Sequence, residues 1–376
     1  MNSFIQWQFE AELQSSEILQ MYRRELLKAA AGATVGLMSY GYLNEASAQV
    51  EDSLRNLADR KGFRFGSAID YQNLQDEWLK DLYRTHCNSL TARNSMKWVG
   101  TERSPGKFTF GQADAIVAFA EAEGMKSYGH TLVWKNVPSW VSKIKDAAEA
   151  RKVMLRHVRA VVDHFKGRVD AWDVVNEPME YDTAEMRSWT IQNLLGDDYV
   201  TESFLAAHEA DPDAVLVLNE AHLEKVGSNF EQRRILLLKL IEAQLAKGAP
   251  IHAVGLQGHF RPGIDKLDEA AVARFCGELK DMGLSVFITE LDASCRFTYA
   301  DKKFNEADYG KIFESFVTTV AESANLKGVT VWGLAERYGE LEPKPVGACR
   351  KYINLYDDNN EPRSTVEGLT AALNSL

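Results

Sequence analysis

The chain has 376 residues, of which 45% are hydrophobic and 26% are charged, so it can bury one large core and suits a single α/β barrel better than two ordinary domains. The formal net charge of −11 argues against the basic face that nucleic-acid-binding proteins carry. We therefore expect one domain without a nucleic-acid partner, for which a neutral polymer is a compatible ligand.

Residues 21–48 have the features of an export signal. The paired Arg23 and Arg24 precede an apolar stretch over residues 29–42, which is too short to span a bilayer as a mature anchor. Residues 23–28 resemble the bacterial twin-arginine signal, whose pathway carries folded proteins. We expect cleavage after Ala48, export to the periplasm or the extracellular space, and no membrane attachment of the mature protein.

Residues 1–20 are acidic, whereas a signal peptide begins with a basic segment. We therefore expect translation to start at Met21, which leaves residues 1–48 as an extension plus signal and residues 49–376 as a single catalytic domain. The alternative is that the first twenty residues form a buried helix.

Beyond residue 50, short apolar or β-branched runs alternate with longer segments of helical period, for example residues 146–165 and 230–247. This pattern is typical of a parallel sheet with covering helices. Four glycines follow predicted helices, where a left-handed cap is favoured: Gly124, Gly167, Gly248 and Gly283. Eight strands are predicted to begin near Phe63, Asn88, Lys126, Val169, Ala214, His252, Leu284 and Lys327. Eight βα units in one unbroken run predict a closed (β/α)8 barrel, also called a TIM barrel.

The four cysteines have none of the spacings that indicate a zinc or redox site. We expect no metal and no cofactor, and we interpret the cysteines as small buried hydrophobic residues, with one disulfide possible. They are Cys87, Cys276, Cys295 and Cys349.

Reacting groups in such barrels lie at the C-terminal ends of the strands. Two glutamates, Glu177 and Glu290, close the fourth and seventh predicted strands. Cleavage of a glycosidic bond needs one carboxylic acid to protonate the leaving oxygen and one carboxylate to attack or stabilise the anomeric carbon. A retaining pair stands about 5 to 5.5 Å apart and an inverting pair about 6.5 to 9.5 Å. The polar residues at the strand exits are His130, Asn176, Glu177, Asn219, Gln257, His259, Glu290, Asp292 and Trp332.

A single glutamate at a strand end is more often a solvated or ion-paired side chain, but the neighbouring residues favour the catalytic interpretation. Asn176 can donate to a sugar 2-hydroxyl, and Asp292 follows Glu290 on the same side of its strand. His259 can orient Glu290. Tryptophans that follow the third and eighth strands can stack on pyranose rings, namely Trp134, Trp140 and Trp332, whereas Trp98 and Trp172 favour packing.

Six motifs in order make residues 62 to about 370 resemble glycoside hydrolase family 10, the endo-1,4-β-xylanases. They are Gly66-Ser67-Ala68, Asn94-Ser95-Met96-Lys97-Trp98, Gly129-His130-Thr131-Leu132-Val133-Trp134, Asp173-Val174-Val175-Asn176-Glu177-Pro178, Gly255-Leu256-Gln257-Gly258-His259 and Ile288-Thr289-Glu290-Leu291-Asp292.

The resemblance implies a retaining double displacement with Glu177 as acid/base and Glu290 as nucleophile, acting on xylan. It also implies that Asn94 holds the second sugar from the cleavage point. The residues that it places around the sugar at the cleavage point are Lys97, His130, Asn176, Gln257, His259 and Trp332.

Several positions depart from the family pattern. Arg93 stands where the family has glutamate, and Lys135 stands where it has histidine, in a segment that also lacks a glutamine. The Asn-Asp-Tyr-Asn expected after the fifth strand is residues 219–222, Asn-Glu-Ala-His, and the segment after Trp332 lacks a second tryptophan. Because arginine pairs well with carboxylates, we hypothesise that the cleft accepts xylan with acidic side groups.

Other functions stay open at this point. The same chemistry could act on another β-1,4-glycan or a small aryl glycoside, or the barrel could bind carbohydrate without catalysis. A metal-dependent hydrolase is disfavoured because no two histidines and an acid occur at ligand spacing. We expect a monomer whose partner is a polysaccharide, either xylan or decorated xylan.

Overall fold

The structure is a computed structural model that describes residues 53–181, 183–261, 263–294, 305, 307–335, 352–357, 359 and 361–376. The predicted export signal, its start at Met21 and its cleavage site lie outside these residues. Cys295, Cys349 and the altered segment that begins at Glu336 lie outside them as well.

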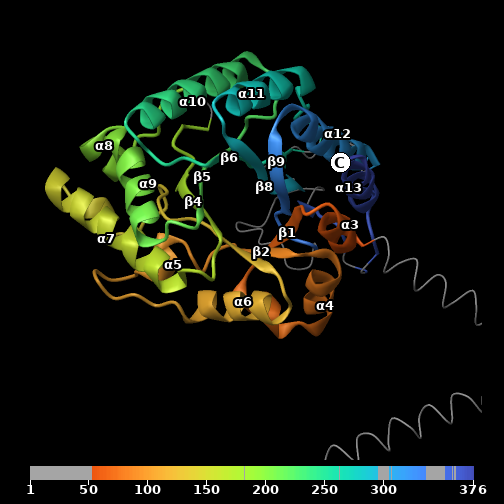
Figure 1. The fold of residues 1–376 in the computed structure, drawn as a ribbon, viewed down its shortest axis with the longest axis horizontal. Coiled ribbons are helices and arrows are strands. Elements are labelled where there is room, and N and C mark those ends of the chain that lie inside the picture. Colours follow the sequence, from red (N-terminus) through yellow and green to blue (C-terminus); the bar gives the residue numbers. More distant parts are fainter. Residues whose placement is uncertain are drawn as a thin grey trace, which may run out of the picture. The chain divides into compact units, whose positions relative to one another are not determined.

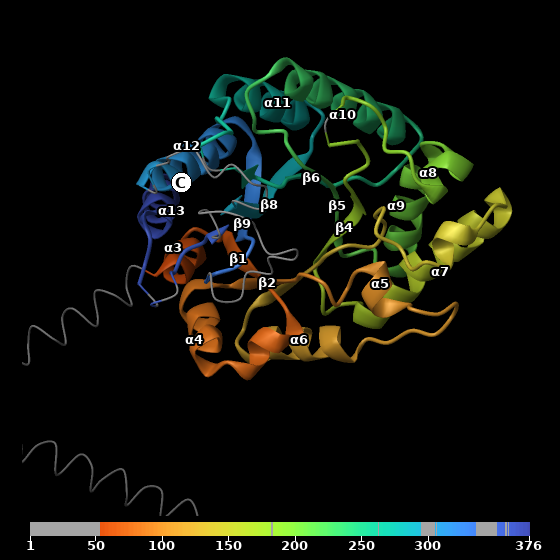
Figure 2. The same cartoon turned by 180° about the vertical axis from the view of Figure 1, so that it is seen from behind.

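Eight parallel strands close into a barrel, seen end-on in Figures 1 and 2, which confirms the predicted (β/α)8 fold. Each strand pairs with the next, and β1 closes the ring by pairing with β9. The barrel strands are β1 Arg64–Ile69, β2 Ser89–Ala92, β3 Lys126–Gly129, β4 Ala171–Asn176, β5 Val215–Glu220, β6 Ala253–Leu256, β8 Ser285–Ser294 and β9 Asn325–Val331. Two short strands pair with the C-terminal end of β8, namely β7 His259–Phe260 and β10 Tyr352–Ile353.

Helices surround the barrel on all sides (Figure 1). Their bounds are α3 Leu54–Arg60, α4 Glu77–His86, α5 Trp98–Thr101, α6 Gly111–Ala122, α7 Ala147–Phe165, α8 Thr190–Leu195, α9 Asp198–Ala210, α10 Ser228–Ala246, α11 Glu269–Asp281, α12 Ala307–Ser323 and α13 Ser364–Ser375, with short 3-10 turns at Tyr71–Gln75 and Val141–Lys143. The two helices predicted over residues 146–165 and 230–247 are confirmed as α7 and α10.

Local signals explain where helices start and stop. The Asp146 side chain accepts a hydrogen bond from the Glu149 amide and caps α7. The four predicted capping glycines all have positive φ, between 65° and 85°, which confirms their role. Among the described residues, no helix combines the length and the apolar character needed to cross a membrane.

The inside of the barrel is layered. A small apolar cluster fills one layer, formed by Tyr128, Ala171, Val217, Ala253 and Phe287. Next to it lies a polar layer that is packed just as tightly, because a Cβ at Gly255 would come within 2.2 Å of Asn219 Oδ1. Glycine at this position therefore leaves the space that Asn219 occupies.

An irregularity in β4 changes which of its side chains face the barrel interior. The pairing with β5 runs Asp173 to Val217 and then Val175 to Leu218, so one extra residue is accommodated on β4. Bulges of this kind re-aim side chains and often lie next to active sites. Here both Asp173 and Asn176 reach Asn219 inside the barrel.

The two described cysteines, Cys87 and Cys276, are buried and unpaired. Burial raises the pKa of the Cys276 thiol to about 12, so it stays protonated at physiological pH. Both behave as the small hydrophobic residues predicted.

Candidate active site

A network of buried polar side chains connects the ends of β3, β4, β5 and β8. Asn219 lies at its centre and donates from Nδ2 to Asn176 Oδ1 and to Glu290 Oε1, each at 2.9 Å. The Thr289 hydroxyl donates to the other end of the same amide, Asn219 Oδ1, at 2.7 Å. The amide is therefore fixed in one orientation. Through it, β5 is hydrogen-bonded to Asn176, which precedes Glu177, and to Glu290.

Asp173 and His130 form the floor of this network. Asp173 Oδ2 lies 2.7 Å from His130 Nδ1, and its other oxygen accepts a 2.6 Å hydrogen bond from the Tyr128 hydroxyl. Burial raises the pKa of Asp173, and the hydrogen bond from His130 opposes that effect. His130 Nδ1 also lies 4.0 Å from Glu290 Oε1, so the hydrogen-bonded pair of His130 and Asp173 is next to the Glu290 carboxylate.

Glu290 is 5% exposed and is surrounded by groups that favour its ionised form. Burial alone would raise its pKa, but the His259 hydrogen bond and the charges of His130, His259 and Lys97 hold it below its usual value. His259 Nε2 lies 3.2 Å from Glu290 Oε2, and His259 Nδ1 lies 2.7 Å from Asp292 Oδ1. These two carboxylates raise the pKa of His259 well above its ordinary value despite its burial, so it stays a cation.

Glu177 directly follows β4 and has a φ of 51°, which is uncommon for a residue with a side chain. Such backbone conformations cost about 1–3 kcal/mol and cluster at functional sites. The residue is 7% exposed. Gln257 donates to Oε1 at 3.2 Å, while Trp134 Nε1 at 2.8 Å and the Tyr181 hydroxyl at 2.5 Å both donate to Oε2.

The loop after Glu177 is tied to the barrel by a buried arginine. Arg233 of α10 donates to Glu220 Oε1 at 2.8 Å and to the Glu180 and Thr183 carbonyl oxygens of the loop. Glu220 in turn accepts the Met179 amide at 3.1 Å. The loop that carries Tyr181 therefore has a defined position beside Glu177.

The remaining predicted residues gather around the two glutamates. Lys97 donates to Asn94 Oδ1 at 3.0 Å and lies 5.0 Å from the Trp134 ring centre. Burial lowers the pKa of Lys97. Trp332 presents its ring to the edges of His130 and His259, with centroid distances of 5.1 and 6.4 Å.

Three residues that flank the site have placements that sequence patterns could not give. Arg93 is 7% exposed. It donates to the Trp332 carbonyl at 2.8 Å and lies 5.7 Å from the Trp332 ring centre, so it contacts both the backbone and the ring of that tryptophan. Trp140 packs edge-on against Trp98. Lys135 lies 4.2 Å from the Tyr181 ring centre.

A possible metal-ligand set in the described part of the chain is His130, Asp173 and Glu290, whose ligand atoms lie within 4.8 Å of one another. Sequence spacing did not reveal it, because the three residues come from three strands. The 2.7 Å separation of His130 Nδ1 and Asp173 Oδ2 is a direct hydrogen bond. The hydrogen bonds from Tyr128 and Asn219 also engage the two carboxylates, so the group is best explained as part of the buried network.

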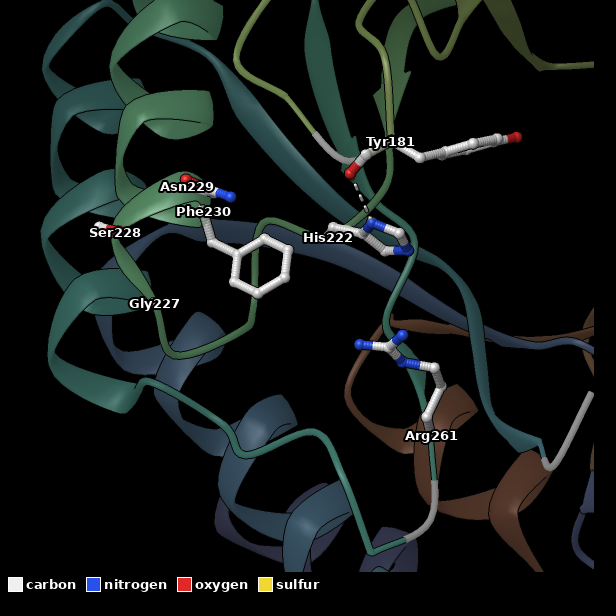
Figure 3. A pocket seen from close by; sticks show the side chains of 7 residues that line it. All are labelled: Tyr181, His222, Gly227, Ser228, Asn229, Phe230 and Arg261. Atoms are coloured by element: carbon white, nitrogen blue, oxygen red, sulfur yellow. Dashed lines mark hydrogen bonds between the residues drawn. The ribbon is translucent and has the colours of Figure 1, made fainter. Parts of the chain in front are cut away.

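A cavity of about 330 Å³ lies beside the loop that follows Glu177 and carries Tyr181 (Figure 3). The Phe230 and His222 rings and the Arg261 guanidinium line it, together with residues 227–229 at the start of α10. Burial lowers the pKa of His222 to about 3, so its ring is neutral. Aromatic rings with a few hydrogen-bonding groups are typical of small-molecule binding sites.

Asp173, Tyr181 and Arg187 belong to the site but were not predicted. Asp173 lies within a strand motif, and the alternation of side chains along a regular strand does not predict that it faces the interior together with Asn176. The irregularity in β4 causes this. Tyr181 and Arg187 lie on a loop, and only the tertiary structure brings the Tyr181 hydroxyl to 2.5 Å and the Arg187 guanidinium to 3.8 Å from Glu177 Oε2. Asn219 stood among the strand-exit residues but was given no role.

Comparison with known proteins agrees with this geometry. Residues 53–372 match glycosyl hydrolase family 10. A β-1,4-xylanase from Dictyoglomus thermophilum is 34% identical over 86% of this chain and 92% of its own length, and an endo-1,4-β-xylanase from Geobacillus stearothermophilus is 32% identical over 80% and 93%.

Solved structures are similar as well. Xylanase 10B from Thermotoga maritima superimposes with a TM-score of 0.77 at 28% identity, covering 86% of this chain and 98% of that one. Xylanase 10B from Thermotoga petrophila in complex with xylobiose gives a TM-score of 0.75, also at 28% identity, over 86% and 97%. The resemblance seen in the motifs is confirmed, and the chain belongs to glycosyl hydrolase family 10.

Proposed function

We propose that this chain is a retaining endo-1,4-β-xylanase in which Glu290 attacks the anomeric carbon and Glu177 serves as acid and then as base. The observation that carries the proposal is the contrast between the two carboxylates. Glu290 faces the His259 cation, which suits a nucleophile that must be ionised. Glu177 accepts its hydrogen bonds from the uncharged groups of Trp134, Tyr181 and Gln257, while the Arg187 guanidinium lies farther off, 3.8 Å from Oε2.

The reaction proceeds in two balanced steps. In the first step the Glu177 proton moves to the leaving oxygen, the glycosidic bond breaks, and Glu290 forms an ester bond to the anomeric carbon. In the second step a water molecule attacks that carbon and gives a proton to Glu177, and the ester bond breaks. Two inversions leave the configuration unchanged.

The neighbouring residues hold the sugar. Trp332 and Trp134 offer ring faces for pyranose stacking, while Lys97, Asn94 and Asn176 offer donors for hydroxyl groups. Three further residues orient the groups that hold the sugar. Asn219 fixes Asn176, Asp173 fixes His130, and Asp292 fixes His259. The substrate is xylan or decorated xylan, and the protein works as an exported monomer.

The hypothesis of acidic side groups stays a prediction, and the two cations that prompted it contribute differently. The Arg93 guanidinium is buried under Trp332 and already engages the Trp332 carbonyl and Asp70. The structure therefore favours Lys135, which is partly exposed, for a direct contact with a substrate carboxylate.

The test is to incubate the purified chain from Gln49 onward with glucuronoxylan and with neutral arabinoxylan. Short xylo-oligosaccharides should appear from both, and proton NMR should detect the β-anomer first. Initial release of the α-anomer would contradict the retaining mechanism. No release of reducing ends from either polymer would contradict the xylanase assignment and favour another β-linked glycan.

The pH dependence should report on His259. Replacing it in His259→Gln removes a cation beside Glu290, so the pKa of Glu290 should rise and the acid limb of kcat/KM should move up by roughly one pH unit or more. The measurement is kcat/KM on xylotetraose between pH 3 and 8. An acid limb at the same pH in both proteins would contradict the assigned role of His259.

A further inference from the structure

Tyr181 makes the shortest contact to the Glu177 carboxylate. Its hydroxyl donates to Oε2 at 2.5 Å, and Trp134 Nε1 donates to the same oxygen at 2.8 Å. Oε1 accepts only the longer 3.2 Å bond from Gln257 in the contacts described. Two short donors therefore occupy one oxygen of Glu177, which leaves Oε1 as the oxygen that gives and takes the proton.

Two cations hold the Tyr181 ring. Lys135 Nζ and the Arg187 guanidinium carbon each lie 4.2 Å from the ring centre, within the range of cation–π attraction. Arg187 also donates to the Glu177 carbonyl at 3.0 Å, pairs with Glu180 at 3.2 Å and lies 3.8 Å from Glu177 Oε2, so this cation ties the ring to the loop and to Glu177. Lys135 comes from the segment after β3, and it occupies the position where the family pattern has histidine.

The backbone of Tyr181 is held from the other direction. His222 lies 3.4 Å from its carbonyl oxygen, and Figure 3 shows the tyrosine ring extending away from the cavity that His222 and Phe230 line. Main chain and side chain are thus both oriented, which directs the hydroxyl to Glu177. Burial and the neighbouring Glu177 charge raise the pKa of Tyr181, so the phenol stays protonated and acts as a donor.

We propose that Tyr181, whose ring contacts Lys135 and Arg187, is a positioning residue that holds the Glu177 carboxylate in place for its proton transfers. The inference rests on the proposed roles of the two glutamates. A hydrogen-bond donor on Oε2 stabilises the ionised carboxylate. That stabilisation is largest before water attacks and weakens as Glu177 takes the proton, so by itself it does not speed the second step. The donor acts by fixing where the carboxylate stands, which the second step needs with every substrate and the first step needs only when the leaving group takes a proton.

The two steps can be separated with 2,4-dinitrophenyl β-xylobioside. Its leaving group needs no protonation, so kcat/KM reports formation of the ester, while kcat reports hydrolysis of the ester. In Tyr181→Phe we expect kcat to fall about 10-fold and kcat/KM to change less than about 2-fold, so KM falls in parallel. A burst of dinitrophenolate in stopped flow should become easier to observe.

Lys135→Met keeps the hydroxyl but removes one cation from the ring, and kcat should fall about 2- to 3-fold. This second variant also serves if Tyr181→Phe folds poorly. The matched control is Tyr356→Phe, which removes a tyrosine hydroxyl that hydrogen-bonds His86, and it should leave both constants unchanged.

A fall in kcat and kcat/KM by the same factor in Tyr181→Phe would show a structural role and overturn the proposal. Unchanged constants would overturn it as well. Both results are distinct from failure of the proposed function, which would show as an inactive wild type or as a Glu177→Gln variant with unchanged kcat, and which would remove the basis of the inference.

Discussion

Replacing Glu290 with alanine should abolish hydrolysis of xylan and reduce kcat on xylo-oligosaccharides by roughly 10⁵-fold or more. The carboxylate is the group that forms the bond to the anomeric carbon in the first step. Its neighbours His259, Asn219 and His130 bind the carboxylate and cannot form this ester themselves. The measurement is release of reducing ends over hours. The wild type is diluted so that its rate can be compared with that of the much slower variant.

Azide distinguishes a lost nucleophile from a lost fold. The alanine leaves a small space beside the His259 cation, where an anion can enter and attack 2,4-dinitrophenyl β-xylobioside. The expected product is the α-xylobiosyl azide, which has the inverted configuration. Melting within a few degrees of the wild type, together with rescue, would support the assignment, whereas residual activity above about 1% would place the nucleophile elsewhere.

The barrel and the location of the two glutamates at its C-terminal end were predictable because both depend on local signals. Alternating strand and helix patterns gave eight βα units, and the C-terminal strand ends are the edge where barrels place reactive groups. Glu177 directly follows β4, as expected, whereas Glu290 lies within β8, which continues to Ser294 beyond its pairing with β6 at Ile288. His259 beside Glu290 followed from the neighbouring order of β6 and β8.

Other features depend on packing that a sequence does not encode locally. Alternation along β4 breaks between Asp173 and Val175, so Asp173 faces the interior together with Asn176. Arg93 was interpreted as a cleft cation because burial is invisible in a motif. Tyr181 and Lys135 lie far apart in the sequence, and only the folded loop shows that Lys135, a departure from the family pattern, contacts the Tyr181 ring.

Replacing Glu177 with glutamine should separate substrates by their leaving groups. On xylotetraose, whose leaving hydroxyl needs a proton, kcat/KM should fall about 10²- to 10⁴-fold, the usual contribution of a positioned general acid. On 2,4-dinitrophenyl β-xylobioside kcat/KM should change little, but kcat should fall because the second step has lost its base. The amide keeps the shape of the side chain and can still accept from Trp134 and Tyr181, so the fold is preserved.

Glu185→Gln is the matched control, because Glu185 is an exposed glutamate on the same loop and its nearest described side-chain contact is with Thr183. It should leave both substrates unaffected. If Glu177→Gln lowered kcat/KM equally on the two substrates, the residue would be needed for binding or folding and not for proton transfer. A leaving-group-dependent loss ties the proton to Glu177, since no change of shape alone would discriminate between a sugar and a dinitrophenolate.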